Sequence, residues 1–334
     1  MSQFPLVLSL GDPAGIGPEL IIQAWREREA KGLMPFVVAG GAQILSQAAE
    51  VLEVPAPVQN IASTHEAAEI FADALPVLKG EDGDYLPGAP DVVGAAVAWN
   101  SLRQATALAV GGDAAALVTA PIAKGLLEQV GFAYPGQTEF LANACDLPED
   151  AAVMMLAGPS LRTIPLTVHC PLAEVPQRLS TELIITRGRI VAAALARDFG
   201  ITQPRLAVTG LNPHAGEDGK FGNEEQAIIA PAIAALLADG ITATGPHPAD
   251  ALFSPHSRTG FDAALCMYHD QALIPVKALD FDQGVNVTLG LPIVRTSPDH
   301  GTAFDIAGKG AAHPGAMIAA IRMAGLCAAR RADG

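Results

Sequence analysis

The sequence is poor in charge, in aromatic side chains and in paired cysteines. Charged residues make up 16% of its 334 positions and aromatic residues 5%, whereas apolar residues make up 50%. An average soluble domain carries roughly 25% charged residues, so we expect part of this surface to be covered in an oligomer. The four cysteines are scattered without a Cys-x-x-Cys pair, which argues against a disulfide framework and against a thiolate zinc site.

Positive charge is scarce as well, and long apolar runs are missing. Lys and Arg number 20 against 35 Asp and Glu, a formal net charge of −15, which disfavours a nucleic acid or an anionic membrane as the partner. No apolar run approaches the roughly 18 residues that a transmembrane helix needs. Residues 1–9 also lack the basic and apolar regions of a signal peptide. We therefore expect a cytoplasmic protein.

Short apolar runs rich in β-formers alternate with longer segments of helical period along the whole chain. This pattern predicts an α/β protein with buried sheets in α/β/α layers. The predicted strands are Leu6–Leu10, Phe36–Ala39, Ala116–Thr119, Val153–Leu156, Thr163–Val168, Leu206–Leu211, Ala264–Tyr268 and Val285–Leu289. One long predicted helix is capped by Asp91 and reaches Val110. The others cover Thr181–Phe199, Glu224–Ala238 and Gly315–Ala329.

Three of the eight histidines follow predicted strands: His169, His214 and His269. The carboxyl ends of parallel strands line the ligand crevice of such sheets, so these imidazoles can converge although they are far apart in sequence. Three imidazoles leave coordination positions open, which is typical of a catalytic divalent-metal site. A single strand-end histidine is more often an ordinary polar residue. Asp270 either orients the imidazole of His269 or caps the following helix.

The polar, glycine-rich turn from Asn212 to Glu225 follows another predicted strand, where such folds usually place their chemistry. Glu224 and Glu225 are also explained as a charge cluster at a helix N-terminus.

Lys277, Asn286 and Arg295 form a possible anion clamp in this acidic chain. Arginine offers a bidentate fork and lysine a mobile point charge, although surface solubility explains each cation alone. Thr138 sits at a predicted helix start, where exposed N–H groups attract phosphate and where a capping role is the alternative.

Neither common nucleotide motif is present. Gly11, Gly15 and Gly17 do not match G-x-G-x-x-G, and Lys309 is followed by Gly310 rather than by Ser or Thr. The glycine-rich segment from Asp299 to Gly310 nevertheless has the composition to wrap a dinucleotide through backbone contacts.

Five blocks together give the chain a resemblance, over essentially its whole length, to the 4-hydroxythreonine-4-phosphate dehydrogenase family of pyridoxal phosphate biosynthesis. The blocks are Gly11-Asp-Pro-Ala-Gly-Ile-Gly-Pro-Glu19, Thr119-Ala-Pro-Ile-Ala-Lys124, Gly210-Leu-Asn-Pro-His-Ala-Gly-Glu217, Tyr268-His-Asp-Gln271 and Arg295-Thr-Ser-Pro-Asp-His-Gly-Thr302. One such block would be unspecific, but all five in this order are highly specific.

The resemblance implies two α/β/α domains like those of isocitrate and isopropylmalate dehydrogenases, with the active site in the cleft between them. One domain would comprise residues 1–130 and 299–334, and the other residues 131–298. The last block also resembles the adenosine-binding loop of those enzymes, which implies NAD or NADP binding. The implied cofactor-binding residues are Gly301, Thr302, Asp305 and Gly308.

The family's metal ligands match the three strand-end histidines, one of which would come from the partner subunit of a homodimer. The ion would be zinc, cobalt or magnesium. The implied substrate contacts are Gln137, Thr138, Lys277, Asn286 and Arg295. Gln137 departs from the family, which often has His there; glutamine still forms hydrogen bonds to a phosphate but carries no charge.

The implied reaction is the oxidation of 4-phosphohydroxy-L-threonine at C3 to 2-amino-3-oxo-4-(phosphooxy)butanoate, which decarboxylates to 3-amino-2-oxopropyl phosphate. Lys277 or Asp270 would carry the proton. One alternative is a related dehydrogenase acting on 4-phosphoerythronate or 4-phosphothreonate. The other is a non-catalytic, metal-dependent binder of phosphorylated metabolites.

Overall fold

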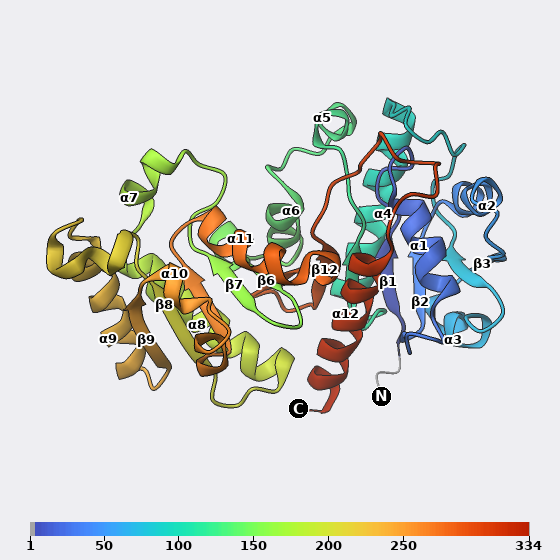
Figure 1. The fold of residues 1–334 in the computed structure, drawn as a ribbon. Helices are drawn as coiled ribbons and strands as arrows, with labels where there is room; N and C mark the ends of the chain where they lie inside the picture. Colours follow the sequence, from blue (N-terminus) through green and yellow to red (C-terminus); the bar gives the residue numbers. More distant parts are fainter. Residues whose placement is uncertain (1–3, 334) are drawn as a thin grey trace. The chain divides into compact units, whose positions relative to one another are not determined.

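The computed structural model describes residues 4–333, which separate into two compact units (Figure 1). Of the described residues, unit 1 comprises 4–152 and 291–333, and unit 2 comprises 153–290. The predicted α/β class is confirmed, since each unit combines a mainly parallel sheet with helices.

Unit 1 contains an all-parallel sheet in the order β3-β4-β2-β1-β5-β12. Its strands are β1 (Leu6–Ser9), β2 (Phe36–Ala39), β3 (Val58–Ile61), β4 (Leu75–Leu78), β5 (Leu117–Thr119) and β12 (Arg295–Pro298). All of them except β3 are buried at every position, because helices cover both faces of the sheet (Figure 1). The strands β3, β4 and β12 are not among the predicted ones.

The helices of unit 1 are α1 (Gly17–Arg26), α2 (Ala42–Val51), α3 (Ala67–Ile70), α4 (Val92–Gly111), α5 (Lys124–Leu127), α6 (Gln137–Ala144) and α12 (Gly315–Asp333). Asp91 caps α4 as expected, with its side chain accepting from the Gly94 N–H at 2.7 Å, and Gly112 ends that helix in a left-handed conformation. Trp99 of α4 packs edge-on against Phe140 of α6 with ring centroids 4.9 Å apart. This contact fixes α6, which carries Gln137 and Thr138.

The unit boundaries differ from the expected domain limits at residues 130 and 298. Residues 131–152 and 291–298 lie in unit 1 because α6 packs on α4 and β12 pairs with β5. Gln137, Thr138 and Arg295 therefore belong to the same unit as the glycine-rich loop.

Unit 2 contains a mixed sheet in the order β11-β6-β7-β10-β8-β9, in which β6 is antiparallel to both neighbours and the last four strands are parallel. Its strands are β6 (Val153–Ala157), β7 (Arg162–Pro165), β8 (Arg205–Thr209), β9 (Thr242–His247), β10 (Ala263–Cys266) and β11 (Val285–Leu289). Its helices are α7 (Val175–Arg178), α8 (Thr181–Phe199), α9 (Ala230–Ala238), α10 (Ala249–Leu252) and α11 (His269–Asp280).

Several predicted elements of unit 2 need correction. The strands expected over Leu206–Leu211 and Ala264–Tyr268 end at Thr209 and Cys266. The strand expected over Thr163–Val168 ends at Pro165, and the chain then turns so that His169 adopts a φ of 51°. The helix expected over Glu224–Ala238 begins with a π-helical turn at Glu225–Ile229 before α9. Pro231 has no amide hydrogen, so it cannot donate the i→i−4 bond of a regular helix at this point.

Candidate functional site

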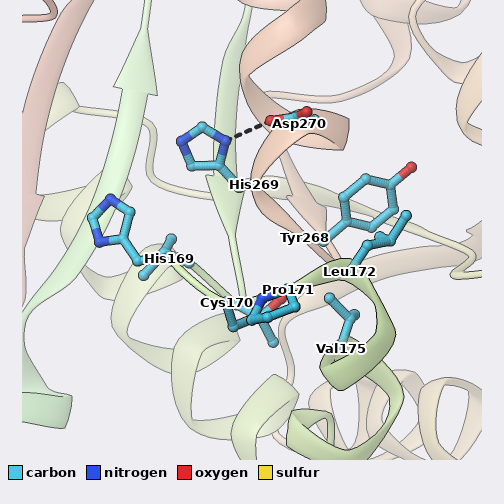
Figure 2. Close-up of a pocket in the computed structure, with 10 residues that line it drawn as sticks. His169, Cys170, Pro171, Leu172, Val175, Tyr268, His269 and Asp270 are labelled. Carbon is cyan, nitrogen blue, oxygen red and sulfur yellow. Dashed lines mark hydrogen bonds and ion pairs between the residues drawn. The ribbon is translucent and has the colours of Figure 1, made fainter.

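A cavity of about 410 Å³ lies in unit 2 between the segments that follow β7 and β10. Ten residues line it: Thr167, Val168, His169, Cys170, Pro171, Leu172, Val175, Tyr268, His269 and Asp270 (Figure 2). The rings of His169 and His269 face this cavity with their centroids 6.1 Å apart. Two of the three predicted metal ligands are therefore neighbours.

Strand pairing brings these two histidines together. β7 and β10 are adjacent and parallel, so their carboxyl ends lie at the same edge of the sheet. Beyond the strands, the Leu166 N–H donates to the carbonyl of Cys266 at 2.8 Å and the Thr167 hydroxyl to that of Met267 at 2.8 Å. The segment before His169 is thus held against the segment before His269.

Asp270 contacts the imidazole of His269 rather than capping the helix. Its Oδ1 lies 2.7 Å from His269 Nδ1, on the side of the ring away from His169 (Figure 2). The N-cap residue of α11 is Tyr268, which makes no side-chain capping bond. A carboxylate at Nδ1 favours the tautomer that leaves Nε2 without a proton, the atom through which such a histidine binds a metal.

His214 lies in the exposed turn after β8, and it is not among the residues that line the cavity. Its ring is 6.2 Å from that of Phe221. Within residues 4–333 of a single chain, no three His, Cys, Asp or Glu side chains are arranged to hold a metal ion. One chain therefore brings together two of the predicted imidazoles, and the three-histidine site stays a prediction.

Arg295 and Gln137 form a polar site in unit 1. The Arg295 Nη2 donates to Gln137 Oε1 at 2.9 Å and to the hydroxyl of Thr119 at 2.7 Å. Arg295 is only 4% exposed, and this burial lowers its pKa to about 10, against the opposing effect of the Glu139 carboxylate. The guanidinium keeps its charge at neutral pH, so it is available to an anion.

Thr138 occupies the first turn of α6, as expected. The N-cap of that helix is Gly136, however, and no side chain caps it. The capping alternative for Thr138 is therefore wrong, and the first N–H groups of the helix have no side-chain acceptor from the N-cap residue.

Lys277 and Asn286 belong to unit 2, on α11 and β11 respectively. Both are half-buried. The side-chain oxygen of Asn286 is inaccessible to solvent and accepts no hydrogen bond within the described part of the chain. Because an unsatisfied buried acceptor is costly, this oxygen is suited to receive a ligand's hydroxyl or ammonium group.

The glycine-rich loop after β12 contains the predicted cofactor residues, and it is tied to the N-terminal block. The Ile16 N–H donates to the Thr302 carbonyl at 2.9 Å. Glu19 is fully buried, and its Oε1 accepts from the Gly308 N–H and, at 3.0 Å, from the Tyr85 hydroxyl. Burial, together with this carboxylate, raises the pKa of Tyr85. Sequence reasoning missed Glu19, although it ends one of the five blocks.

Between residues 4 and 333 the structure contains no helix that is both long and apolar enough to cross a membrane.

Comparison with known proteins gives one consistent result. Residues 32–324 match the family model of the pyridoxal phosphate biosynthetic protein PdxA. The 4-hydroxythreonine-4-phosphate dehydrogenase of Erythrobacter litoralis is 76% identical over 99% of this chain and 98% of its own length. The crystal structure of that enzyme from Klebsiella pneumoniae superposes with a TM-score of 0.85 at 39% identity, covering 97% of this chain and 98% of the other.

A terephthalate 1,2-cis-dihydrodiol dehydrogenase from Burkholderia xenovorans is also similar, with a TM-score of 0.66 at 28% identity over 96% of this chain and 97% of the other. The family model and the Erythrobacter relative each cover well over half of the sequence. The chain therefore belongs to the pyridoxal phosphate biosynthetic protein PdxA family, the family of the 4-hydroxythreonine-4-phosphate dehydrogenases, and is an oxidoreductase.

Proposed function

We propose that this enzyme oxidises 4-phosphohydroxy-L-threonine at C3, with NAD or NADP as the oxidant and with a divalent metal, zinc, cobalt or magnesium, at the histidines. The product, 2-amino-3-oxo-4-(phosphooxy)butanoate, would lose carbon dioxide to give 3-amino-2-oxopropyl phosphate. The observation that carries this proposal is the His169–His269 pair, with Asp270 at Nδ1 of His269, in a chain of this family.

The donor set fits a divalent ion, because imidazole nitrogens suit zinc and cobalt and because Asp270 orients one of the rings. His169, His214 and His269 would hold the ion, one of them contributed by the partner chain of a homodimer. When bound, the metal would supply Lewis-acid chemistry at the substrate hydroxyl and the nicotinamide would supply a hydride acceptor. Gly301, Thr302, Asp305 and Gly308 would bind that cofactor.

The chain's own side chains would bind and orient the substrate. Arg295 would hold an anionic group of the substrate, with Gln137 and Thr138 donating further hydrogen bonds to it. The buried oxygen of Asn286 would accept from the substrate's hydroxyl or ammonium group. Lys277 or Asp270 would take the proton of the C3 hydroxyl.

The test measures the absorbance of reduced nicotinamide with purified protein, cofactor, divalent metal and 4-phosphohydroxy-L-threonine, in the presence and absence of a chelator. Parallel reactions contain 4-phosphoerythronate or 4-phosphothreonate. We expect chelator-sensitive reduction with the threonine compound. Reduction only with 4-phosphoerythronate or 4-phosphothreonate would show that this acid is the substrate instead, and Gln137 would be the first position to examine. No reduction with any of them would refute the proposed activity.

The shared metal site has its own test. Substituting His214 by Ala should remove the metal and the activity together. The inactive variants His169→Ala, His214→Ala and His269→Ala can also be mixed in pairs to form mixed dimers. Activity should return only where the two substituted histidines reach one site from different chains, because the second site of the mixed dimer then keeps all three histidines. Recovery in two of the three mixtures identifies the histidine that crosses the interface, and recovery in none contradicts a site shared between subunits.

A further inference from the structure

The turn that carries His214 has an unusual backbone. Six consecutive residues adopt positive φ angles: His214 at 55°, Ala215 at 51°, Gly216 at 81°, Glu217 at 42°, Asp218 at 56° and Gly219 at 89°. Four of the six are not glycine, and residues with a Cβ atom disfavour this left-handed region. Such a run persists only where the surrounding structure holds it in place.

One buried carboxylate provides that hold. Glu225 is 4% exposed, and its Oε1 accepts from the backbone N–H groups of Leu211 and Asn212, each at 2.8 Å. Its Oε2 accepts from the side-chain amide of Asn212 at 3.1 Å. These donors immediately precede the left-handed run, so the carboxylate fixes the chain at the point where it leaves β8.

The turn is also wrapped closely around this carboxylate. A Cβ atom added to Gly216 would lie 2.6 Å from Oε2 of Glu225, and one added to Gly210 would lie 3.1 Å from Oε1. Only glycine leaves room for the carboxylate at Gly216, inside the left-handed run itself. The position of Glu225 therefore accounts for Gly216, whereas a Cβ atom at Gly210 would first meet the Cα of Ala215, at 2.8 Å.

The residue that carries this carboxylate belongs to a buried helical segment. Glu225 begins the π-helical turn that leads into α9, and Ile229, Ala232 and Leu236 of this segment are fully buried. Helix α9 packs against α8, where a Cβ on Gly188 would lie 2.8 Å from the Leu236 side chain. Single π-helical turns of this kind occur frequently at functional sites.

We propose that Glu225 is a positioning residue, which holds the His214 turn in its left-handed conformation and thereby sets the affinity of the site for a divalent metal. This inference rests on the proposed role of His214 as a ligand. Loss of the carboxylate leaves two backbone N–H groups without their acceptor and frees the turn to relax. The imidazole of His214 is then no longer preorganised, and metal binding has to order it.

The test compares three variants. Glu225→Met removes every acceptor at similar size, Glu225→Asp keeps the charge but withdraws it from both backbone donors, and Glu225→Gln keeps one oxygen for them. Cobalt(II) is titrated into the metal-free homodimer and followed by its visible absorption. We expect the Kd to rise about tenfold or more for the Met and Asp variants, as for other residues that orient metal ligands, and less than about threefold for Gln.

Two controls accompany the titration. The first is Glu224→Gln, because Glu224 is half-buried and its carboxylate accepts a hydrogen bond from the Asn212 side chain, at 2.8 Å, rather than from the backbone of the turn. The Kd of this variant should stay near that of the wild type. The second is hydrogen exchange of the metal-free protein. Amides of residues 210–219 should exchange faster in Glu225→Met than in the wild type, and those of α8 should not.

The outcomes are distinct. A wild-type Kd for cobalt in both Glu225→Met and Glu225→Asp overturns the proposal, and so does unchanged exchange of residues 210–219. If Glu225→Met does not fold, Glu225→Asp decides by the same two measurements. Cobalt binding that survives His214→Ala refutes instead the proposed ligand role of His214, while exchange still reports whether Glu225 holds the turn.

Discussion

The guanidinium of Arg295 donates a hydrogen bond to the side-chain oxygen of Gln137 across 2.9 Å. Both residues lie in unit 1, where Thr119 supplies the second acceptor for the same nitrogen. Gln137 is the substrate contact at which the resemblance implies that many relatives have His instead. A neutral amide oxygen orients Arg295 without neutralising it, so the full positive charge stays available to an anionic substrate.

Replacing Gln137 by Leu should therefore weaken the binding of the phosphorylated substrate. The change removes an acceptor of a 4% exposed guanidinium, and we expect the KM for that substrate to rise by about tenfold, or roughly 1.4 kcal/mol. The KM for the nicotinamide cofactor should change little. Gln129→Leu is the matched control, because Gln129 is exposed and donates to the Gly125 carbonyl at the surface. An equal effect of both substitutions, or none, would rule out this role of Gln137.

Substitution of Glu19 should affect the cofactor selectively. Its buried carboxylate accepts from the Gly308 N–H in the predicted cofactor loop and from the Tyr85 hydroxyl. In Glu19→Leu both donors lose their acceptor, which costs about 1–3 kcal/mol per buried group. We expect the Kd for NAD, measured by fluorescence titration, to rise about tenfold or more.

Two comparisons decide whether Glu19 acts through the loop. Tyr85→Phe removes one of the donors without leaving an orphan, so its effect on the Kd for NAD should be smaller. Glu69→Leu, on the exposed surface of α3, should have no effect. If Glu19→Leu lowers the melting temperature but leaves the Kd for NAD unchanged, Glu19 stabilises the unit without positioning the loop.

The four cysteines should react with iodoacetamide at different rates. Cys266 and Cys327 are buried, and burial raises the pKa of Cys266, so neither should be modified in the folded protein. Burial, and secondarily Asp146, also raises the pKa of Cys145. Cys170 is partly exposed and lines the cavity beside His169. Cobalt(II) with substrate should slow labelling of Cys170 but not of Cys145, as measured by peptide mass spectrometry; equal labelling with and without them would place the ligands elsewhere.

Acid should erase the contribution of one ion pair to stability. Asp262 accepts from the Arg205 side chain at 3.0 Å, and this hydrogen bond lowers the pKa of Asp262 below its ordinary value of 3.8. A carboxylate with a lowered folded-state pKa stabilises the protein above the unfolded-state pKa, and this stability is lost as the pH falls through the folded value. Asp262→Asn should therefore lower the melting temperature by a few degrees at neutral pH.

That difference in melting temperature should shrink as the pH falls below 3.8, the ordinary pKa of Asp262, and disappear once the pH is below the lowered folded-state pKa. The control is Asp239→Asn, which breaks the ion pair between Asp239 and Arg189. The side chains of that pair are more exposed than those of Asp262 and Arg205, so the charge contributes less to stability there. A melting-temperature difference for Asp262→Asn that is the same at neutral and acid pH would show that the pair does not contribute through its charge.

Local sequence determined most of the elements of this protein. β2, α8 and β11 have the predicted bounds, and Asp91 caps α4 as expected, because apolar period and capping chemistry act within a few residues. The edge strand β3 was missed because only one of its four residues, Ile61, is buried, which leaves little hydrophobic signal. The helix predicted from Glu224 begins instead with a π-helical segment. Pro231 and the buried Glu225 override the α-helical propensity there.

The sequence by itself also selected His169, His214, His269 and Arg295, since strand-end histidines and rare cations are visible without a structure. Only the tertiary structure decided their partners. Parallel pairing of β7 with β10 places His169 beside His269. Pairing of β12 with β5 brings Arg295 within hydrogen-bond distance of Thr119 and Gln137. These contacts join residues about a hundred or more positions apart, and no periodic pattern encodes them, because strand order depends on which apolar faces cover one another once the chain is compact.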